Sequence, residues 1–453
     1  MTLDEVLGLR VAVWGMGAEG SAVVALARER GVEPLLVDDH PERLGDGVAD
    51  GTDGAPVLLP AEVAWSRVDV VVRAPGVSRY RPELAAAEAA GVVVTTAMAL
   101  WLEDYADAPV VAVTGTKGKS TTAALAAAIL AADGLEVALI GNIGVPVLDT
   151  YGAPRADAYV VEVSSYQAVD VTRSPGVVVL TSLAPDHLDW HGGVEPYYRD
   201  KLRLVEAGRP DGSVALAVSA GNAEAVRRTA HHRDRTLYGP EGRVRVDAGG
   251  WVVVDGTRVA DAGRLRVPGR HNAWNLCGAV AGALLLTGSA PSAEAVASAA
   301  DGFAGLPSRC HTLGVHDGRT FVDDALASNP FASAASIETF AGRPLTVIVG
   351  GADRGVDPAP LVDAVTSHLP PASVVVLAPG SERLAEALAG AGVPTGAVRV
   401  AEDLAGAVAL ATALTPVGGV VLFSPGAPTP EGGGGYRERS RQFAEAAGVA
   451  TPA

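Results

Sequence analysis

Short runs of β-branched and aliphatic residues recur along the chain, and each run is followed by a glycine-containing turn and an alanine-rich stretch. The runs are continuously apolar, which predicts strands buried on both faces, as in parallel sheets. Strands that alternate with helices are typical of α/β folds. The predicted strands lie at residues 10–14, 34–37, 68–72, 110–114, 138–140, 159–163, 177–180, 345–349, 373–377 and 420–423.

Residues 240–266 depart from this pattern, because apolar and polar positions alternate there around an Asp-Gly pair, which predicts a β-hairpin. One open sheet rarely holds more than about ten strands, so we expect several sheets. Polar, proline-containing breaks near 104–109 and 305–307 suggest three α/β domains. We predict a Rossmann-like domain over 1–106, a central P-loop ATPase-like domain over 107–306 and a Rossmann-like domain over 307–453. The central domain should hold a mainly parallel sheet with a small antiparallel insert.

Composition narrows the class of protein. The 453 residues are 48% hydrophobic and 19% charged, which excludes wholesale disorder. A formal charge of −17 argues against a nucleic-acid or anionic-membrane binder. Two cysteines build neither a disulfide framework nor a cysteine zinc site. No signal peptide is evident, and the most apolar helical run is about half the length that a bilayer requires. We expect a cytoplasmic monomer that binds neither nucleic acid nor membrane.

The first candidate site follows the first predicted strand. Residues 15–20 read GMGAEG and open a predicted helix at Ser21, with Asp38 and Asp39 about 20 residues further on. Small residues allow the backbone to approach a diphosphate, and a helix N-terminus favours its charge. The ligand could be NAD(P) or another nucleotide diphosphate, or the motif could be a close-packed turn without a ligand.

The second candidate site is the strongest signal in the chain. Residues 115–121 read GTKGKST between a predicted strand and a predicted helix at 121–132. Backbone amides can cradle phosphate, Lys119 can reach the β- and γ-phosphates, and the Ser120 hydroxyl can ligate Mg²⁺. The full Walker spacing would place glycine at position 113, where this chain has valine.

An acidic metal partner is expected near this loop. Glu162 lies near the end of a predicted buried strand, where ligands bind in open α/β sheets. A carboxylate buried there without a cation would be costly, so Mg²⁺ is its natural partner. The alternative is a carboxylate paired with a lysine.

With these residues in place, the chain resembles the Mur ligases of peptidoglycan synthesis, and within them the MurD type, over essentially its whole length. The resemblance rests on several blocks that keep their order along the chain. They are Gly115–Thr121 (with Lys117 where asparagine is more usual), Gly141–Gly144, Glu162–Gln167, Asp186–Asp189 with Lys201–Arg203, Gly269–Asn275, Leu306–Arg309 and Asp323–Asp324.

The resemblance implies a reaction. ATP would phosphorylate the carboxylate of UDP-N-acetylmuramoyl-L-alanine, and the amine of an amino acid would attack the acyl phosphate to give an amide, ADP and phosphate. ATP and Mg²⁺ are the implied cofactors. The first domain would then hold the UDP end of the substrate instead of NAD, the central domain ATP, and the third domain the amino acid.

The resemblance also implies residue roles. Lys119, Glu162, His187 and Lys201 would be catalytic. ATP would contact Gly115, Thr116, Lys117, Gly118, Lys119, Ser120, Thr121, Asn275, Arg309 and Asp324. The UDP substrate would contact Gly15, Met16, Gly17, Asp38, Asn142 and His187. Metal ions would be held by Ser120, Glu162, His187 and a carbamoylated Lys201. Carbamoylation turns an ammonium, which cannot bind metal, into an anionic oxygen ligand. By sequence alone Lys201 could instead be a solvated helical lysine.

The amino-acid site departs from the pattern of MurD proteins that add D-glutamate. Residues 324–329 read DALASN where DSKATN is usual, Arg354 replaces a lysine, and residues 424–429 read SPGAPT where SPACAS is usual. Arginine clamps a carboxylate bidentately, whereas lysine is a point charge. These changes resemble a MurD variant group that adds L-glutamate. We therefore expect L-glutamate to be held by Ser328, Arg354, Thr429 and Tyr436, with D-glutamate as the alternative.

Other functions explain less of the sequence. An NAD-dependent oxidoreductase would leave residues 115–121 unused. A GTPase would need an Asn-Lys-x-Asp block, which is missing from the sequence. A folylpolyglutamate synthetase shares the ATP loop and glutamate chemistry, but is disfavoured by the complete domain before that loop. A related amide ligase of specialised metabolism stays open.

Overall fold

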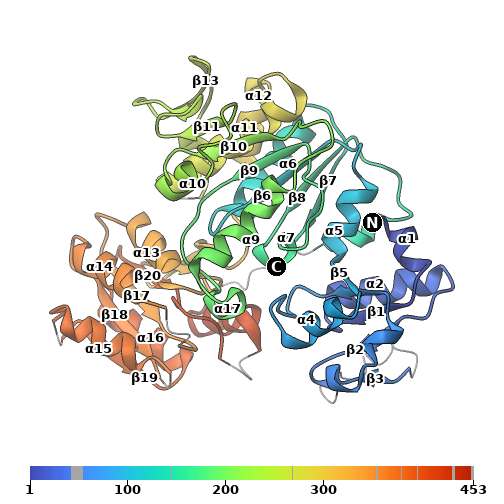
Figure 1. Cartoon of the computed structure of the whole chain (residues 1–453). Helices are drawn as coiled ribbons and strands as arrows, with labels where there is room; N and C mark the ends of the chain where they lie inside the picture. The colour runs from blue at the N-terminus through green and yellow to red at the C-terminus, as the bar shows by residue number, and fades with distance from the viewer. Residues whose placement is uncertain are drawn as a thin grey trace. The chain divides into compact units, whose positions relative to one another are not determined.

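The computed structural model is an α/β protein with three sheets of five, nine and six strands (Figure 1). It describes residues 1–41, 55–143, 145–267, 269–353, 356–378, 380–394, 396–430 and 434–449. Two compact units are present, Met1–Gly263 with Trp274–Ala300, and Arg264–Ala273 with Asp301–Ala453. The first unit holds the five- and nine-stranded sheets. The predicted domain boundaries after residues 106 and 306 stay a prediction.

The five-stranded sheet is entirely parallel, in the order β3-β2-β1-β4-β5. Helix α2 packs on one face and α4 on the other, since their buried side chains belong to two separate clusters. The elements are α1 Leu3–Leu7, β1 Val11–Trp14, α2 Ala18–Glu29, β2 Leu35–Val37, β3 Val57–Leu58, β4 Val70–Arg73, α4 Pro82–Ala89 and β5 Val93–Thr95.

The nine-stranded sheet has the order β14-β13-β12-β11-β10-β9-β6-β8-β7. Its strands are β6 Val110–Thr114, β7 Val137–Gly141, β8 Ala158–Glu162, β9 Val177–Leu180, β10 Ala215–Ser219, β11 Thr236–Gly239, β12 Val244–Val246, β13 Trp251–Val254 and β14 Thr257–Asp261. Its helices are α6 Lys119–Ala132, α7 Ser165–Ala168, α8 Leu188–His191, α9 Val194–Glu206, α10 Ala223–Arg228, α11 Arg270–Thr287 and α12 Ala293–Gly302.

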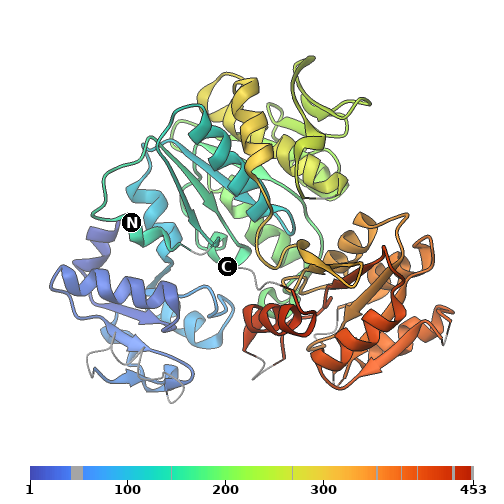
Figure 2. The same cartoon turned by 180° about the vertical axis from the view of Figure 1, so that it is seen from behind.

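Helices cover both faces of this sheet. Gly282 of α11 lies so close to β6 that an added Cβ would be 3.1 Å from Val111. Leu202 of α9 shares a core cluster with Ala112, the next residue of β6, which points to the opposite face. Figures 1 and 2 accordingly show α9 on one face and α6 with α11 on the other. Because both faces of the sheet are covered, side chains on both faces of its central strands must be apolar, which explains the continuous apolar runs in the sequence.

The predicted hairpin is confirmed, and its place in the fold is now defined. Strands β13 and β14 pair antiparallel around Asp255 and Gly256, and β13 also pairs antiparallel with β12. The hairpin thus extends one edge of the parallel sheet.

Helix α5 (Ala97–Asp104) joins the two sheets of the first unit into one core. Trp101 is fully buried, and its Nε1 donates a 2.9 Å hydrogen bond to Thr150 Oγ1. The Trp101 ring stacks on Tyr105 and meets the edge of Tyr159, which lies in β8. The five- and nine-stranded sheets consequently form one compact unit.

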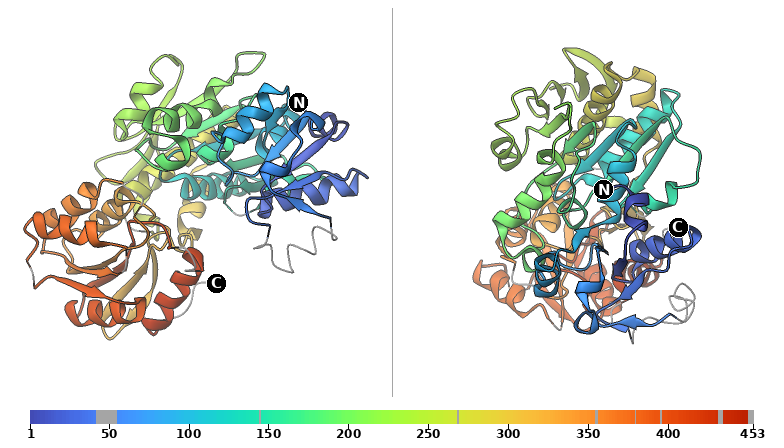
Figure 3. Two further views of the ribbon diagram at one scale, coloured as in Figure 1. Left: turned by 60° about the horizontal axis from the view of Figure 1, so that its bottom comes forward. Right: turned by 45° about the vertical axis from the view of Figure 1, so that its right-hand side comes forward.

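The six-stranded sheet of the second unit has the order β15-β16-β20-β17-β18-β19, with only β15 antiparallel to its neighbour among the described strands. Val347 and Val349 of β17 face α13 and α14, whereas Ile348 faces α16 and α17. Figure 3 shows these layers. The elements are β15 His311–His316, β16 Arg319–Asp323, α13 Pro330–Thr339, β17 Leu345–Val349, α14 Ala359–Ser367, β18 Ser373–Leu377, α15 Glu382–Gly390, β19 Val398–Ala401, α16 Leu404–Leu414, β20 Val420–Phe423 and α17 Gly435–Ala446.

All ten predicted strands are present, and five of them (β6, β9, β17, β18 and β20) have the predicted bounds. The structure adds strands that are short, partly exposed or polar, among them β3, β5, β15 and β19. Their side chains carry a weak hydrophobic signal because they lie at or near sheet edges.

Candidate functional site

The phosphate loop joins β6 to α6, and two of its glycines have conformations that other residues rarely adopt. Gly115 has a φ of +148°, and a Cβ there would lie 2.0 Å from Thr181 Oγ1. Gly118 has a φ of +87°, and a Cβ there would lie 2.5 Å from Asn275 Oδ1. Each glycine is required both by backbone conformation and by the lack of space. Helix α6 begins at Lys119, two residues before the predicted start.

The loop is held against the segment that follows β9. The Thr116 amide donates to the Ser182 carbonyl (2.8 Å), and the Lys117 amide donates to Ser182 Oγ (2.9 Å). The Lys117 carbonyl accepts hydrogen bonds from Thr181 Oγ1 (2.6 Å) and Ser182 Oγ (3.1 Å). Sequence reasoning missed Thr181 and Ser182. The signal was available, since polar residues directly follow a buried parallel strand there.

Glu162 lies at the carboxyl end of β8, next to β6, and is fully buried. Ser120 Oγ donates a 2.7 Å hydrogen bond to Glu162 Oε2, and Asn142 Nδ2 donates a 3.0 Å hydrogen bond to Oε1. Three residues from separate predicted blocks therefore meet at one carboxylate. These oxygen donors fit Mg²⁺, which prefers carboxylate and hydroxyl oxygens.

Lys201 is buried instead of solvated. Its side chain, from the middle of α9, is 2% exposed, and Nζ donates a 2.9 Å hydrogen bond to the Gly115 carbonyl. Burial, and secondarily the charge of Lys119, lowers the pKa of Lys201 well below its usual range. An unmodified lysine offers no oxygen to a metal, so the second predicted metal site fits only a carbamoylated Lys201.

Lysine occurs at only three positions, Lys117, Lys119 and Lys201, although Lys and Arg together number 35. Lys119 Nζ donates to the Thr116 carbonyl (3.1 Å), within the phosphate loop. Lys117 Nζ lies 3.6 Å from Asp186 Oδ2. All three lysines thus lie at or beside this loop. Lysine and arginine differ in charge geometry and in their ability to lose a proton, so the two residue types are not equivalent at these positions.

His187 is half-buried next to Asp186, with Nε2 3.8 Å from Asp186 Oδ2. Its backbone φ of +52° is unusual for a residue with a side chain. Burial lowers the pKa of His187 to about 4, so the imidazole is neutral at pH 7. A neutral imidazole can act as a ligand or as a hydrogen-bond partner for a substrate.

A second hydrogen-bonded group, centred on the buried side chains of His191 and Asp200, lies beside His187. His191 Nδ1 is 2.7 Å from Asp200 Oδ2, and His191 Nε2 is 3.0 Å from Ser165 Oγ. Tyr80 OH donates to the same Asp200 carboxylate at 2.6 Å. Sequence reasoning missed this group. Its members come from four separate segments, so no local sequence motif indicates that they lie together.

The GMGAEG motif forms a tight turn between β1 and α2. Helix α2 begins at Ala18, so the predicted helix start at Ser21 was wrong by three residues. A Cβ at Gly20 would lie 1.8 Å from the Gly15 carbonyl oxygen. Asp38 Oδ2 accepts a 2.8 Å hydrogen bond from the Met16 amide. The predicted UDP-contacting residues of this turn are therefore together, and the Gly17 side of the turn is open.

The second unit holds the remaining predicted residues. Asp324 is buried after β16 and accepts hydrogen bonds from Ser336 Oγ (2.6 Å), Ser424 Oγ (2.7 Å) and the Cys310 amide (3.0 Å). Burial raises the pKa of Asp324 to about 6. It therefore connects three segments of this unit. Three further predicted residues, Arg309, Ser328 and Thr429, are half-buried. Arg354 lies outside the described residues.

Comparison with known proteins identifies the family. Residues 113–283 match the Mur ligase middle domain, and residues 308–426 match the Mur ligase glutamate ligase domain. The chain belongs to the Mur ligase family. As a family member it is an ATP-dependent ligase that forms a C–N bond.

Several relatives are similar over nearly their whole length. A protein of Micromonospora sp. is 41% identical, with 98% of both chains covered. One of Salinispora tropica is 42% identical, with 98% of this chain and 99% of the relative covered. One of Xanthomonas campestris pv. campestris is 37% identical, with 99% and 97% covered. Each is named UDP-N-acetylmuramoyl-L-alanine–L-glutamate ligase.

Solved structures share the Mur ligase fold. The UDP-N-acetylmuramate-alanine ligase MurC of Thermotoga maritima has a TM-score of 0.60 at 19% identity and covers 96% of this chain and 98% of its own. The Mycobacterium tuberculosis folylpolyglutamate synthase complexed with ADP has a TM-score of 0.58 at 19% identity, covering 73% and 91%. Both confirm the predicted α/β fold class.

Among the residues that the structure describes, no helix is both long and apolar enough to cross a membrane.

Proposed function

We propose that this Mur ligase joins L-glutamate to UDP-N-acetylmuramoyl-L-alanine in the cytoplasm, through an acyl phosphate, with ATP converted to ADP and orthophosphate. The observation that carries the proposal is the phosphate loop packed beside the Ser120–Glu162 pair (2.7 Å). The named activity of relatives at 37–42% identity supports the choice of both substrates.

The loop geometry suggests where ATP binds. The amides of Thr116 and Lys117 are already bonded to Ser182, so the phosphates would meet the amides from Gly118 onward. These amides form the N-terminus of the 14-residue helix α6, whose dipole favours negative charge. Lys119 would leave the Thr116 carbonyl and turn to the β- and γ-phosphates.

In the first step, a carboxylate oxygen of the muramoyl substrate attacks the γ-phosphorus, and the bond to the β-phosphate oxygen of ADP breaks. Two anions must approach each other, so fixed positive charge is required. Lys119 supplies such charge. Mg²⁺, when held by Ser120 and Glu162, supplies further neutralisation of the phosphates. Asn142 keeps the Glu162 carboxylate oriented through its 3.0 Å hydrogen bond.

In the second step, the neutral amine of glutamate attacks the acyl carbon. Orthophosphate leaves, and the positively charged nitrogen loses one proton to solvent or to a base, which gives the amide. The neutral His187 can accept a hydrogen bond or bind metal with a carbamoylated Lys201. The turn at Gly15–Gly20, with Asp38, would hold the UDP end.

The acceptor enantiomer rests on the sequence of the second unit. Residues 324–329 and 424–429 differ from the blocks usual in enzymes that add D-glutamate, and Arg354 replaces a lysine. The amino-acid blocks differ from the usual ones at several positions, whereas the phosphate loop at residues 115–121 differs only at Lys117, and this contrast favours a changed acceptor.

The test uses the full-length enzyme with UDP-N-acetylmuramoyl-L-alanine, ATP, Mg²⁺ and each glutamate enantiomer in turn, with phosphate release and the amide product both measured. We expect turnover with L-glutamate at least tenfold faster than with D-glutamate. Turnover with D-glutamate alone would overturn the L assignment and keep the ligase. Turnover with neither would favour a related amide ligase with another acid or amine.

A further inference from the structure

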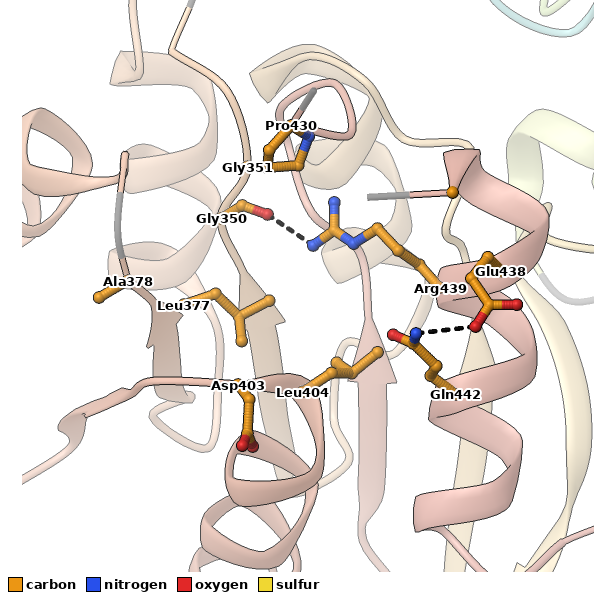
Figure 4. A pocket seen from close by; sticks show the side chains of 11 residues that line it. Gly350, Gly351, Leu377, Ala378, Asp403, Leu404, Pro430, Glu438, Arg439 and Gln442 are labelled. Carbon is orange, nitrogen blue, oxygen red and sulfur yellow. Dashed lines mark hydrogen bonds between the residues drawn. The ribbon is translucent and has the colours of Figure 1, made fainter. Parts of the chain in front are cut away.

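A cavity of about 480 Å³ lies in the second unit, at the carboxyl ends of β17 and β18 (Figure 4). Ligands bind at this edge in open α/β sheets. The cavity is lined by Gly350, Gly351, Leu377, Ala378, Asp403, Leu404, Pro430, Gly434, Glu438, Arg439 and Gln442. Its size is that of a small-molecule site.

Arg439 of α17 borders this cavity and is only 8% exposed. Its Nη2 donates a 2.8 Å hydrogen bond to the Gly350 carbonyl, which fixes the guanidinium. Nη1 is buried and has no hydrogen-bond partner among the residues that the structure describes. In Figure 4, Nη1 points toward the side of the cavity where Pro430 lies. A buried donor without a partner is costly and therefore requires an explanation.

The charge of Arg439 is not neutralised by any described carboxylate. Glu438 is bonded to Arg441 and Gln442, and its carboxylate points away from Arg439 in Figure 4. Asp403 caps α16 by accepting a 2.7 Å hydrogen bond from the Gly406 amide. The ring of Phe423, 5.0 Å from Arg439 Cζ, offsets only part of the cost of burying a cation. An anion in the cavity would supply the missing partner.

We propose that Arg439 binds a carboxylate of the incoming glutamate in this cavity, an inference that rests on the proposed function. A guanidinium held in place on one side can grip a carboxylate with its remaining N–H groups. Two of the four predicted acceptor residues adjoin the cavity along the chain. Thr429 precedes Pro430, and Tyr436 lies one helical turn before Arg439 on α17.

A purely structural role of Arg439 would have different kinetic consequences from a role in carboxylate binding. If Arg439 only supported the turn at Gly350, its loss would lower stability and turnover with every acceptor equally. A carboxylate-binding role instead raises the KM for glutamate and weakens the preference for glutamate over glutamine, whose side chain carries no charge. The KM for ATP, which the first unit binds, should not change in that case.

The experiment compares the wild type with Arg439→Gln, Arg439→Lys and the control Arg441→Gln, which removes an exposed guanidinium from the same helix. Acceptors are the active glutamate enantiomer and the matching glutamine. We expect Arg439→Gln to raise the glutamate KM about tenfold to a hundredfold, the scale of one charge-assisted hydrogen bond. The glutamate-to-glutamine preference should fall by a similar factor, and the ATP KM should stay within twofold. Arg439→Lys should give an intermediate glutamate KM, and it serves alone if Arg439→Gln does not fold. Arg441→Gln should match the wild type.

An unchanged glutamate KM, or an equal loss of kcat with both acceptors, would overturn the inference while leaving the ligase activity intact. If the wild type turns over neither glutamate, the proposed function fails, and equilibrium dialysis with radiolabelled glutamate decides the inference. Binding that Arg439→Gln loses and Arg441→Gln keeps would support the carboxylate site, whereas absent or unaltered binding would overturn it.

Discussion

The side-chain amine of Lys201 donates a 2.9 Å hydrogen bond to the carbonyl oxygen of Gly115, so a residue in the middle of α9 lies directly against the phosphate loop. The two residues are 86 positions apart. The contact makes Lys201 a part of the cluster around the phosphate loop, and its burial favours the uncharged amine.

An uncharged amine reacts with CO₂, so we predict that Lys201 carries a carbamate. The enzyme equilibrated with ¹³C-bicarbonate should show one carbamate carbon resonance, which is simple to assign because the chain has three lysines. Lys201→Arg, which stays charged and is not carbamoylated, should lack that resonance and lose about a hundredfold or more in turnover. A resonance that persists in Lys201→Arg would contradict the assignment.

Gly118→Ala should weaken ATP binding. Its positive φ disfavours a side chain by about 1 kcal/mol, and the new Cβ would lie 2.5 Å from Asn275 Oδ1. Gly134→Ala is the matched control, because Gly134 has a similar φ of +97° but open space around it. Urea denaturation should show a loss of about 1 kcal/mol in both variants. Only Gly118→Ala should raise the KM for ATP, by about tenfold or more. Equal ATP KM values in the two variants would show that the contact with Asn275 is unimportant.

The buried ion pair between Arg73 and Asp170 should be essential for the stability of the first unit. Arg73 Nε donates a 2.7 Å hydrogen bond to Asp170 Oδ2, and both side chains are almost fully buried. Asp170→Asn leaves a buried charge without its partner, which costs about 3–5 kcal/mol. The control Asp255→Asn breaks the exposed pair with Arg243 and should cost less than about 1 kcal/mol. Urea denaturation of both variants measures the difference, and similar values would refute the buried pair's importance.

Asp324 should make stability depend on pH in a defined direction. Its pKa in the folded protein is about 6, above the value of 3.8 for an unperturbed aspartate, because the carboxyl is buried. The folded state therefore binds the proton more tightly, and its free energy of unfolding falls as pH rises from about 4 to about 6. The loss is about 3 kcal/mol in total. Asp324→Asn should remove this part of the pH dependence. The two unfolding curves, compared between pH 4 and 7, should diverge in slope up to pH 6 and run parallel above it. Parallel curves throughout would refute the shift.

Local sequence signals were sufficient for much of the fold. Residues 110–114 and 345–349 are strands with the predicted bounds, since buried parallel strands require unbroken apolar runs. The phosphate loop was predictable for the same kind of reason, because Gly115 and Gly118 occupy conformations and spaces that only glycine tolerates. Glu162 was placed beside Ser120 by a general rule, that the carboxyl ends of parallel strands meet at one edge.

The sequence by itself thus determined the α/β class, the glycine loop between β6 and α6, and the family, because these depend on residue types within short segments. Only the tertiary structure decided that Lys201 is buried and that His191 joins Asp200 to Ser165. It also decided that Arg439 borders a cavity with no described carboxylate as its partner. Burial and charge pairing are set by segments far apart along the chain. The local sequence around a lysine or arginine in an amphipathic helix therefore does not show whether its side chain is exposed to water or lies in a buried site.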